Sequence, residues 1–401
     1  MTTDDIRKQF PQLGRTVYGR PLVYLDNAAT SLRPLPVTER WEHISLQATA
    51  NLHRAVHHIA VEATQAYEDA RAAVAVFINA PSADEVIFTS GATHSLNIAA
   101  YSIGDAFINE GDEIIVSESE HHSNIVPWQL LCRRKGAELK VLPIDDEGRL
   151  CTEKLLSLFS PRTRLMCVAH ISNVLGLVNP IEEVSSICRT AGVMLLVDGA
   201  QGVVHQDVDV QALGCDFYAF SGHKMYGVPG TGVLWGRREL LDQMPPMFGG
   251  GEMIESVSWK ESRWAPLPRK FEAGTQNISG APCFVQAIDV LKHMPKDDGL
   301  RDFVYDSLLQ IPGLRLFGTA ADRKLKVPVF SFAVEGVHHE DMALILDKMG
   351  IAVRSGQMCA EPLMERFGVT GMLRASFAPY NTMQEAEYFI TSLRKAISML
   401  K

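Results

Sequence analysis

Two short segments near the middle of the chain carry an aspartate and a lysine whose chemistries complement each other. They read VDGAQ at 197–201 and SGHK at 221–224. A buried lysine amine forms a Schiff base with the aldehyde of pyridoxal phosphate, and an acid keeps the pyridine nitrogen of that cofactor protonated. Taken singly, Asp198 is more often a turn residue and Lys224 a surface residue. Together, with serine and histidine beside the lysine on a glycine turn, they predict a cofactor site.

Both segments follow stretches that are typical of buried strands. Residues 193–197 are an apolar run, and residues 216–220 are apolar after Asp216. The carboxyl ends of parallel strands are where α/β proteins bind ligands. Similar runs alternate with amphipathic stretches from a helical pattern at 58–78 to about residue 235. The other predicted strands of this region are 85–89, 112–117, 138–142 and 164–170. This alternation predicts an α/β fold in which helices cover both faces of a mostly parallel sheet.

The pattern changes after about residue 285. Short predicted strands at 327–334, 352–354 and 372–377 lie among predicted helices near 338–349 and 382–400. We therefore expect a large cofactor-binding domain over 20–285. A smaller α+β domain over 286–401, with the N-terminal segment 1–19, would complete the chain. Residues 243–275 are rich in Gly, Pro and Trp, which predicts a long surface excursion or interface segment.

Composition narrows the class of protein. The 401 residues are 46% hydrophobic with a net charge of −9 and have no long basic run, which argues against nucleic acid as a partner. The N-terminus does not resemble a signal peptide, and no apolar run is long enough to span a membrane. Seven scattered cysteines form no Cys-x-x-Cys pair, so we expect free thiols, no metal site and a cytoplasmic location.

Several further residues could hold the cofactor. The turn SGAT at 90–93 lies between a predicted strand and helix, where backbone N–H groups and the Thr93 hydroxyl favour a phosphate. Ser221 and His223 could add donors to the same phosphate. His121 follows a strand and could stack on a planar ring, and Asn173 could contact the cofactor phenolate. Each alone also fits an ordinary turn or helix-start residue.

A second reactive segment reads RSGQMC at 354–359. A cysteine thiolate is the better nucleophile when it is exposed and near positive charge, and Arg354 lies on the same loop as Cys359. Arg374 lies on an otherwise apolar strand, where a buried guanidinium needs an anionic partner. A substrate carboxylate matches the bidentate fork of arginine, and a structural pair with Asp or Glu is the alternative.

Motifs along the chain resemble those of the cysteine desulfurases and selenocysteine lyases, in the class V aminotransferase group that includes the cysteine sulfinate desulfinases. The likeness runs in order from about residue 22 to residue 381. The segments that carry it are YLDNAAT at 24–30, NLHR at 51–54, EHHSNIVPW at 120–128, DGAQ at 198–201, SGHK at 221–224, RSGQMC at 354–359 and LRASF at 373–377.

The resemblance implies an aspartate-aminotransferase-like fold, pyridoxal 5'-phosphate as cofactor and a homodimer. By resemblance Lys224 is the Schiff-base lysine, Asp198 pairs with the pyridinium, and His121 stacks on the ring. The other implied cofactor contacts are Asn173 and Gln201 near the phenolate, Thr93, Ser221 and His223 at the phosphate, and Thr275 at the phosphate of the neighbouring subunit. The implied substrate contacts are Arg374 at the carboxylate, with Arg354, Asn173 and His53, the last reaching toward the partner's site.

The implied reaction converts L-cysteine to L-alanine, leaves the sulfur on Cys359 and passes it to an acceptor protein. The sulfur could serve iron–sulfur cluster assembly, thiolated nucleotides or selenium use. Selenocysteine lyase or cysteine sulfinate desulfinase activity is the alternative, with kynureninase-like or epimerase chemistry less favoured. A nucleotide-binding or scaffolding protein has little support, because no phosphate-loop or complete dinucleotide motif occurs. Two departures from the family pattern, Ala92 and Met358, remove a phosphate hydroxyl and a histidine beside the thiol.

Overall fold

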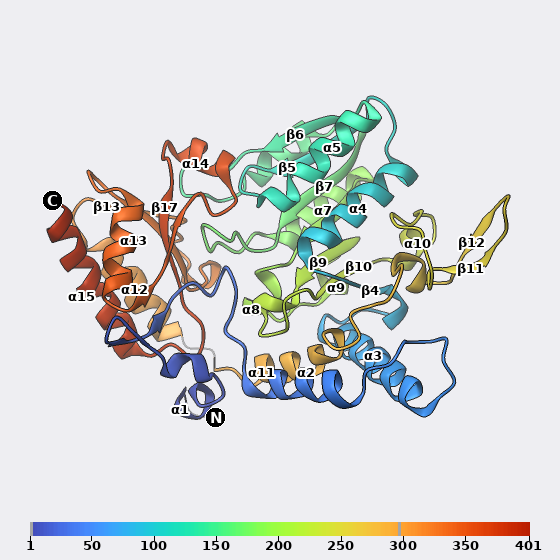
Figure 1. The fold of residues 1–401 in the computed structure, drawn as a ribbon. Coiled ribbons are helices and arrows are strands. Elements are labelled where there is room, and N and C mark those ends of the chain that lie inside the picture. The colour runs from blue at the N-terminus through green and yellow to red at the C-terminus, as the bar shows by residue number, and fades with distance from the viewer. Residues whose placement is uncertain (1–2, 296–297) are drawn as a thin grey trace.

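A seven-stranded sheet forms the centre of the larger part of the molecule. The computed structural model describes residues 3–295 and 298–401 (Figure 1). The strand order is β4-β10-β9-β8-β7-β5-β6, and β10 alone is antiparallel to its neighbours. The strands are β4 (Val86–Thr89), β5 (Glu113–Ser117), β6 (Glu138–Leu142), β7 (Thr163–Ala169), β8 (Met194–Asp198), β9 (Phe217–Ser221) and β10 (Gly232–Gly236). The predicted α/β fold with a mostly parallel sheet is thereby confirmed.

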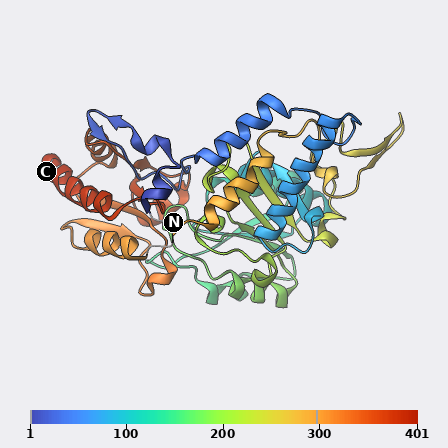
Figure 2. The ribbon, with the colours of Figure 1, turned by 90° about the horizontal axis from the view of Figure 1, so that it is seen from below.

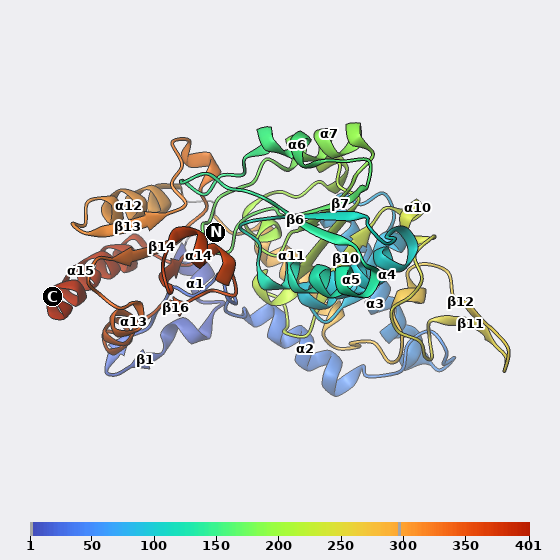
Figure 3. The ribbon, with the colours of Figure 1, turned by 90° about the horizontal axis from the view of Figure 1, so that it is seen from above.

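Helices cover both faces of this sheet because its strands are apolar on both sides. Within β5, Ile114 and Val116 pack against α4 and α5, whereas Ile115 joins the opposite core with α3 and α7. Figures 2 and 3 show the helices on either side of the sheet. The helices of this part are α2 (Leu35–Gln47), α3 (His58–Phe77), α4 (Ala92–Phe107), α5 (Val126–Lys135), α6 (Leu155–Leu158), α7 (Ile181–Ala191), α8 (Gly202–His205), α9 (Val210–Leu213), α10 (Arg238–Leu241) and α11 (Phe284–Lys292).

A smaller antiparallel sheet lies beside the large one. Its strand order is β13-β14-β17-β16, and its apolar core packs against α12, α13 and α15. The elements are β13 (Leu314–Phe317), β14 (Val329–Val334), β16 (Arg354–Gly356), β17 (Met372–Ser376), α12 (Asp298–Leu309), α13 (His339–Lys348), α14 (Glu361–Phe367) and α15 (Met383–Leu400). This confirms the expected α+β character of the C-terminal part.

The N-terminal segment joins the two parts. It holds α1 (Thr3–Arg7), β1 (Thr16–Val17), β2 (Arg20–Pro21) and β3 (Val23–Tyr24), and β3 pairs in parallel with β15 (Ile351–Ala352). Shortly after β3, Asp26 forms an isolated parallel β-bridge with Ser376, the last residue of β17. The N-terminal segment is therefore bonded to the smaller sheet's region. The division between 20–285 and 286–401 stays a prediction. Residues 1–2 and 296–297, which it includes, lie outside the described ranges.

The long excursion at 243–275 contains an element that the sequence pattern did not predict. Strands β11 (Ile254–Val257) and β12 (Ser262–Trp264) form a hairpin that projects from the molecule on the side away from the smaller sheet (Figure 1). Its side chains are largely exposed, Trp259 completely so. Within the described residues, no helix is long and apolar enough to cross a membrane.

Candidate active site

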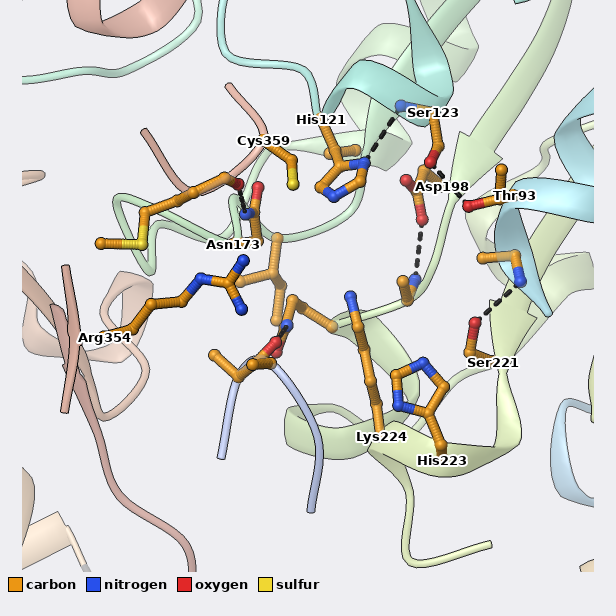
Figure 4. Close-up of a pocket in the computed structure, with 18 of the residues that line it drawn as sticks. Thr93, His121, Ser123, Asn173, Asp198, Ser221, His223, Lys224, Arg354 and Cys359 are labelled. Atoms are coloured by element: carbon orange, nitrogen blue, oxygen red, sulfur yellow. Dashed lines mark hydrogen bonds between the residues drawn. The ribbon is translucent and has the colours of Figure 1, made fainter. Parts of the chain in front are cut away.

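The candidate site is built where several strands of the large sheet end together. Strands β4, β5, β7, β8 and β9 run in the same direction, so their carboxyl ends meet at one edge of the sheet. Asp198 and Ser221 are the last residues of β8 and β9, and Thr93, His121 and Asn173 lie shortly after the ends of β4, β5 and β7. A cavity of about 180 Å³ at this edge is lined by Thr93, His121, Asn173, Asp198, Gln201, Ser221, His223, Lys224, Arg354, Cys359 and Arg374, among others (Figure 4).

Asp198 and Lys224 lie across the cavity from the elements that carry the thiol. Asp198 ends β8, is buried, and accepts a hydrogen bond from the Ala200 N–H at 2.9 Å. Lys224 ends a short 3₁₀ turn, Gly222–Lys224, after β9. Burial raises the pKa of Asp198 and lowers the pKa of Lys224, and the mutual attraction of the two charges opposes both shifts. A lysine amine with a lowered pKa is neutral more readily, as a nucleophile or base must be.

The start of α4 borders one end of the cavity. The Ala92 N–H donates to Ser221 Oγ at 2.7 Å, and Thr93 Oγ1 lies 2.7 Å from Ser123 Oγ. Gly91, with a φ of +152°, brings the backbone against Gly232, where an added Cβ would lie 2.4 Å from the Gly91 Cα. These N–H and hydroxyl groups at the start of a 16-residue helix suit a phosphate.

Two histidines border the same space in their neutral form. His121 Nδ1 accepts from the Ser123 N–H at 3.0 Å, which leaves the proton on Nε2. Burial lowers the pKa of His121 to about 3, and the positive charge of Lys224 adds to this shift. Burial likewise lowers the pKa of His223 to about 4, and its Nδ1 lies 3.2 Å from Thr30 Oγ1. A neutral imidazole is suited to stacking on an aromatic ring or hydrogen bonding to a phosphate.

Arg374 and Arg354 bring positive charge to the opposite wall. Arg374 is 2% exposed, and its Nη2 donates to Asp26 Oδ1 at 3.0 Å. Its Nη1 donates to the Asn173 carbonyl at 2.8 Å, whereas its buried Nε has no partner among the described residues. The structural pair with Asp26 is therefore present, and an unpartnered N–H is left for an anionic ligand. Asp26 was not singled out from the sequence, although it lies in the YLDNAAT segment.

Cys359 lies on the loop between β16 and α14, and its side chain lines the cavity together with Arg354 (Figure 4). The other six cysteines are buried and Cys359 is partly exposed, so it is the accessible thiol of the seven. The Asn173 amide N–H donates to the Met358 carbonyl at 2.9 Å, so in this structure the Asn173 side chain holds the cysteine loop. The Gln201 amide donates to the Ala28 carbonyl at 2.8 Å beside the cavity.

Two predicted site residues, Thr275 and His53, do not line the cavity of their own chain. Thr275 is exposed, and the ring of His53 lies 3.5 Å from Glu68. Conversely, Ser123 lines the cavity without having been predicted, although its position two residues after His121 could have indicated it. No group of three or more His, Cys, Asp or Glu side chains that could hold a metal ion occurs within 3–295 and 298–401.

Comparisons with known proteins agree with this arrangement. Residues 23–389 match the model of the family described as aminotransferase class-V. A probable cysteine desulfurase of Vibrio cholerae is 44% identical over the full length of both chains. A cysteine desulfurase of Cronobacter sakazakii is 46% identical, covering 97% of this chain and 96% of its own.

Solved structures show the same relationship. The crystal structure of the cysteine desulfurase CsdA from Escherichia coli has a TM-score of 0.90 at 38% identity, with all of both chains covered. The apo structure of a cysteine desulfurase from Thermococcus onnurineus has a TM-score of 0.92 at 36% identity, covering 99% of this chain and 98% of that one. The chain therefore belongs to the aminotransferase class-V family and, within it, to the cysteine desulfurases.

Proposed function

We propose that the protein binds pyridoxal 5'-phosphate and converts L-cysteine to L-alanine, with the sulfur transferred to Cys359. One observation carries this proposal: a single cavity gathers a lysine, a carboxylate, an anion-binding helix start, an unpartnered arginine N–H and an accessible thiol. These residues fit the cofactor. Its phosphate needs hydroxyl and N–H donors, its ring needs a neutral imidazole and a carboxylate, and its aldehyde needs a primary amine.

The residues that would hold the cofactor divide by the part they suit. Thr93, Ser221, His223 and the Ala92 N–H suit the phosphate, and Asp198 suits the ring nitrogen. His121 suits the ring face, with Gln201 and Asn173 beside the phenolate. When bound, the cofactor supplies an electron sink for the pair left behind when a proton leaves Cα of the substrate.

The chain's own groups account for the remaining steps. Arg374 would hold the substrate carboxylate through its free Nε, with Arg354 adding positive charge. The Lys224 amine would take the proton from Cα, and Cα takes up a proton again before alanine is released. The Cys359 thiolate would attack the substrate sulfur, forming an S–S bond while the Cβ–S bond breaks. The electron pair of the broken bond stays with Cβ, which takes up a proton to give alanine.

The persulfide on Cys359 must then pass its outer sulfur to a reductant or to an acceptor protein. Partial exposure of Cys359 supports access by such a partner. The free state of all seven cysteines supports a reducing cytoplasmic setting. Supply of sulfur for iron–sulfur cluster assembly is one use that fits this chemistry.

We also propose a homodimer with composite sites, as the positions of Thr275 and His53 outside the cavity suggest. Apolar side chains at the end of α2 and along the segment that leads into α3 are exposed, with Leu46 at 74% and Val56 at 97%. Buried polar atoms without partners in the described chain include both amide atoms of Gln276, next to Thr275. A second copy covering this face would explain both features.

Mixing two variants tests the composite site. In a heterodimer of Lys224→Ala and Thr275→Ala subunits, one site would combine an intact Lys224 with the partner's intact Thr275. We expect cofactor retention at that site to return to the level of a heterodimer of Lys224→Ala with the unchanged chain. Retention no better than in the Thr275→Ala homodimer would show that Thr275 acts within its own subunit.

The proposed reaction is tested by incubating the purified protein with L-cysteine and a reductant. Alanine and sulfide should form in equal amounts. In a matched incubation without the reductant, mass spectrometry should find an additional sulfur on the peptide that contains Cys359. A comparison with L-selenocysteine and L-cysteine sulfinate distinguishes the alternative activities. Alanine from these two substrates but none from L-cysteine would contradict the proposal.

A further inference from the structure

The backbone at the candidate sulfur acceptor has an unusual conformation. Met358 and Cys359 have φ values of +55° and +56°, in the left-handed region that disfavours residues with a Cβ. Two consecutive non-glycine residues in this region keep that conformation only when surrounding contacts determine it. The Met358 side chain, which is 3% exposed, makes such contacts. The Met358 and Cys359 carbonyls also accept hydrogen bonds from loops of the large part.

One residue of the large part bonds both to Cys359 and to the start of the helix that follows it. The His122 N–H donates to the Cys359 carbonyl at 2.7 Å, and His122 Nε2 accepts from the Glu361 N–H at 2.9 Å. Because a backbone N–H can only donate, Nε2 must carry a lone pair, so the ring is neutral with its proton on Nδ1. His121 lines the cavity, whereas His122 is not among its lining residues and bonds to the cysteine loop. Of the two adjacent histidines, His121 therefore lines the cavity and His122 holds the cysteine loop.

We propose that His122 is a positioning residue that fixes the Cys359 loop against the cavity by bridging residues 359 and 361. The inference rests on the proposed role of Cys359 as sulfur acceptor. The two hydrogen bonds by which His122 holds the loop, called the clamp below, can be tested without that role. The clamp matters to the step in which the thiolate must meet the substrate sulfur at bonding distance. It should matter less to cofactor binding and to proton transfer by Lys224, because Lys224, Asp198 and the start of α4 belong to the large part and not to the loop.

His122→Ala removes the side-chain acceptor and keeps the backbone N–H. We expect the rate of alanine formation from L-cysteine to fall about tenfold, as loss of a single positioning hydrogen bond would produce. Alanine formation from L-selenocysteine should fall less than about twofold, because that leaving group depends less on the thiolate. His122→Gln should restore the L-cysteine rate to within about twofold, since Gln Oε1 can accept the same N–H.

Two measurements on the holoenzyme report on the clamp without using activity. Hydrogen exchange of the Glu361 amide should become at least about tenfold faster in His122→Ala and return toward the parent rate in His122→Gln. Alkylation of Cys359 by iodoacetamide, followed by mass spectrometry, should also accelerate in His122→Ala. His338→Ala is the matched control, since the His338 side chain also accepts a helix-start N–H, from Glu340, at the start of α13.

The outcomes separate this inference from the proposed function. Unchanged exchange and alkylation in a folded His122→Ala protein would overturn the clamp. Equal losses on both substrates, or no rescue by His122→Gln, would also overturn it. Should His122→Ala fail to fold, His122→Gln with parent-like exchange at Glu361 would still support the clamp, and fast exchange there would contradict it. The Glu361 exchange rate could change in His122→Ala while the parent protein forms no persulfide on Cys359. That result would support the clamp and contradict only the sulfur-acceptor role.

Discussion

Arg354 and Arg374 lie directly opposite each other on the adjacent antiparallel strands β16 and β17. Like charges in such a pair repel each other, and the Arg354 charge contributes to lowering the pKa of Arg374, after the larger effect of burial. The Asp26 carboxylate balances one of the two charges. An additional anion is needed to balance the other, and the carboxylate of an amino-acid substrate meets this need.

Arg374→Lys should therefore weaken substrate binding and leave the cofactor in place. Lysine keeps the positive charge but has no guanidinium. The arginine guanidinium donates to Asp26 and Asn173 and still has its Nε for a ligand. We expect KM for L-cysteine to rise by at least about tenfold, measured by steady-state alanine formation at full cofactor occupancy. Asp26→Asn keeps an oxygen acceptor for Nη2 and should raise KM less. A normal KM in Arg374→Lys would contradict the assignment.

Lys224→Ala should abolish covalent attachment of the cofactor, because Lys224 is the primary amine that lines the cavity. After borohydride reduction, mass spectrometry of the parent should find the cofactor on the peptide that contains Lys224. The variant should carry none and should lose essentially all activity. Lys260→Ala, on the exposed hairpin, is the control and should behave as the parent. Covalent cofactor on the Lys224→Ala protein would assign the attachment to another amine.

Buried Glu120 should make the stability of the fold depend on pH. Burial raises the pKa of Glu120 to about 7, partly offset by hydrogen bonds from Ser117, Asn124 Nδ2 and the Ala169 N–H. Between its ordinary pKa near 4.5 and about pH 7, the folded state binds more protons than the unfolded state. The free energy of unfolding therefore falls as pH rises through this window, by up to about 3 kcal/mol from this group.

Glu120→Gln removes this titration. The melting temperature of the variant relative to the parent should rise between pH 5 and pH 8, as followed by differential scanning fluorimetry. Taking the difference between the two proteins cancels the opposite contributions of His121, His170 and His205, whose lowered pKa values destabilise the fold at acid pH. A constant difference across this pH range would show that Glu120 does not titrate there.

The strand ends that position the site could be predicted because local sequence encodes them. The apolar runs before Asp198 and Ser221 identify strands buried on both faces, and parallel strands align their ends. The antiparallel placement of β10 and the β11–β12 hairpin were not predicted. Gly232–Gly236 is short and has no polar alternation, and the hairpin side chains pack against little of the described chain, so neither has a clear periodic signal.

The bonds between distant segments could not be predicted, because they depend on how the two sheets meet. Asn173 was expected at the cofactor, but its amide donates to Met358, 185 residues away. The Asp26–Arg374 pair spans 348 residues. A residue type indicates what a side chain can bind, whereas the partner it binds is decided by packing between elements. The roles of Asn173 in cofactor and substrate binding stay predictions.

In the proposed reaction, Cys359 accepts the sulfur atom and does nothing else. Its thiol is the partly exposed one of the seven and is directed into the cavity that Lys224 also lines. Cys359→Ala should bind the cofactor normally, because no predicted cofactor contact is removed. Loss of a nucleophile needed for one step commonly costs several orders of magnitude in rate, about 4 kcal/mol or more of transition-state stabilisation.

The most direct measurement is the ratio of alanine formation from L-cysteine to that from L-selenocysteine, in Cys359→Ala and in the parent. Buried Cys283→Ala is the control for loss of a thiol without loss of the acceptor. We predict that the ratio falls by at least about a hundredfold in Cys359→Ala, because the selenium leaving group needs the thiolate far less. Equal losses on both substrates would contradict the account and leave Cys359 with a structural role.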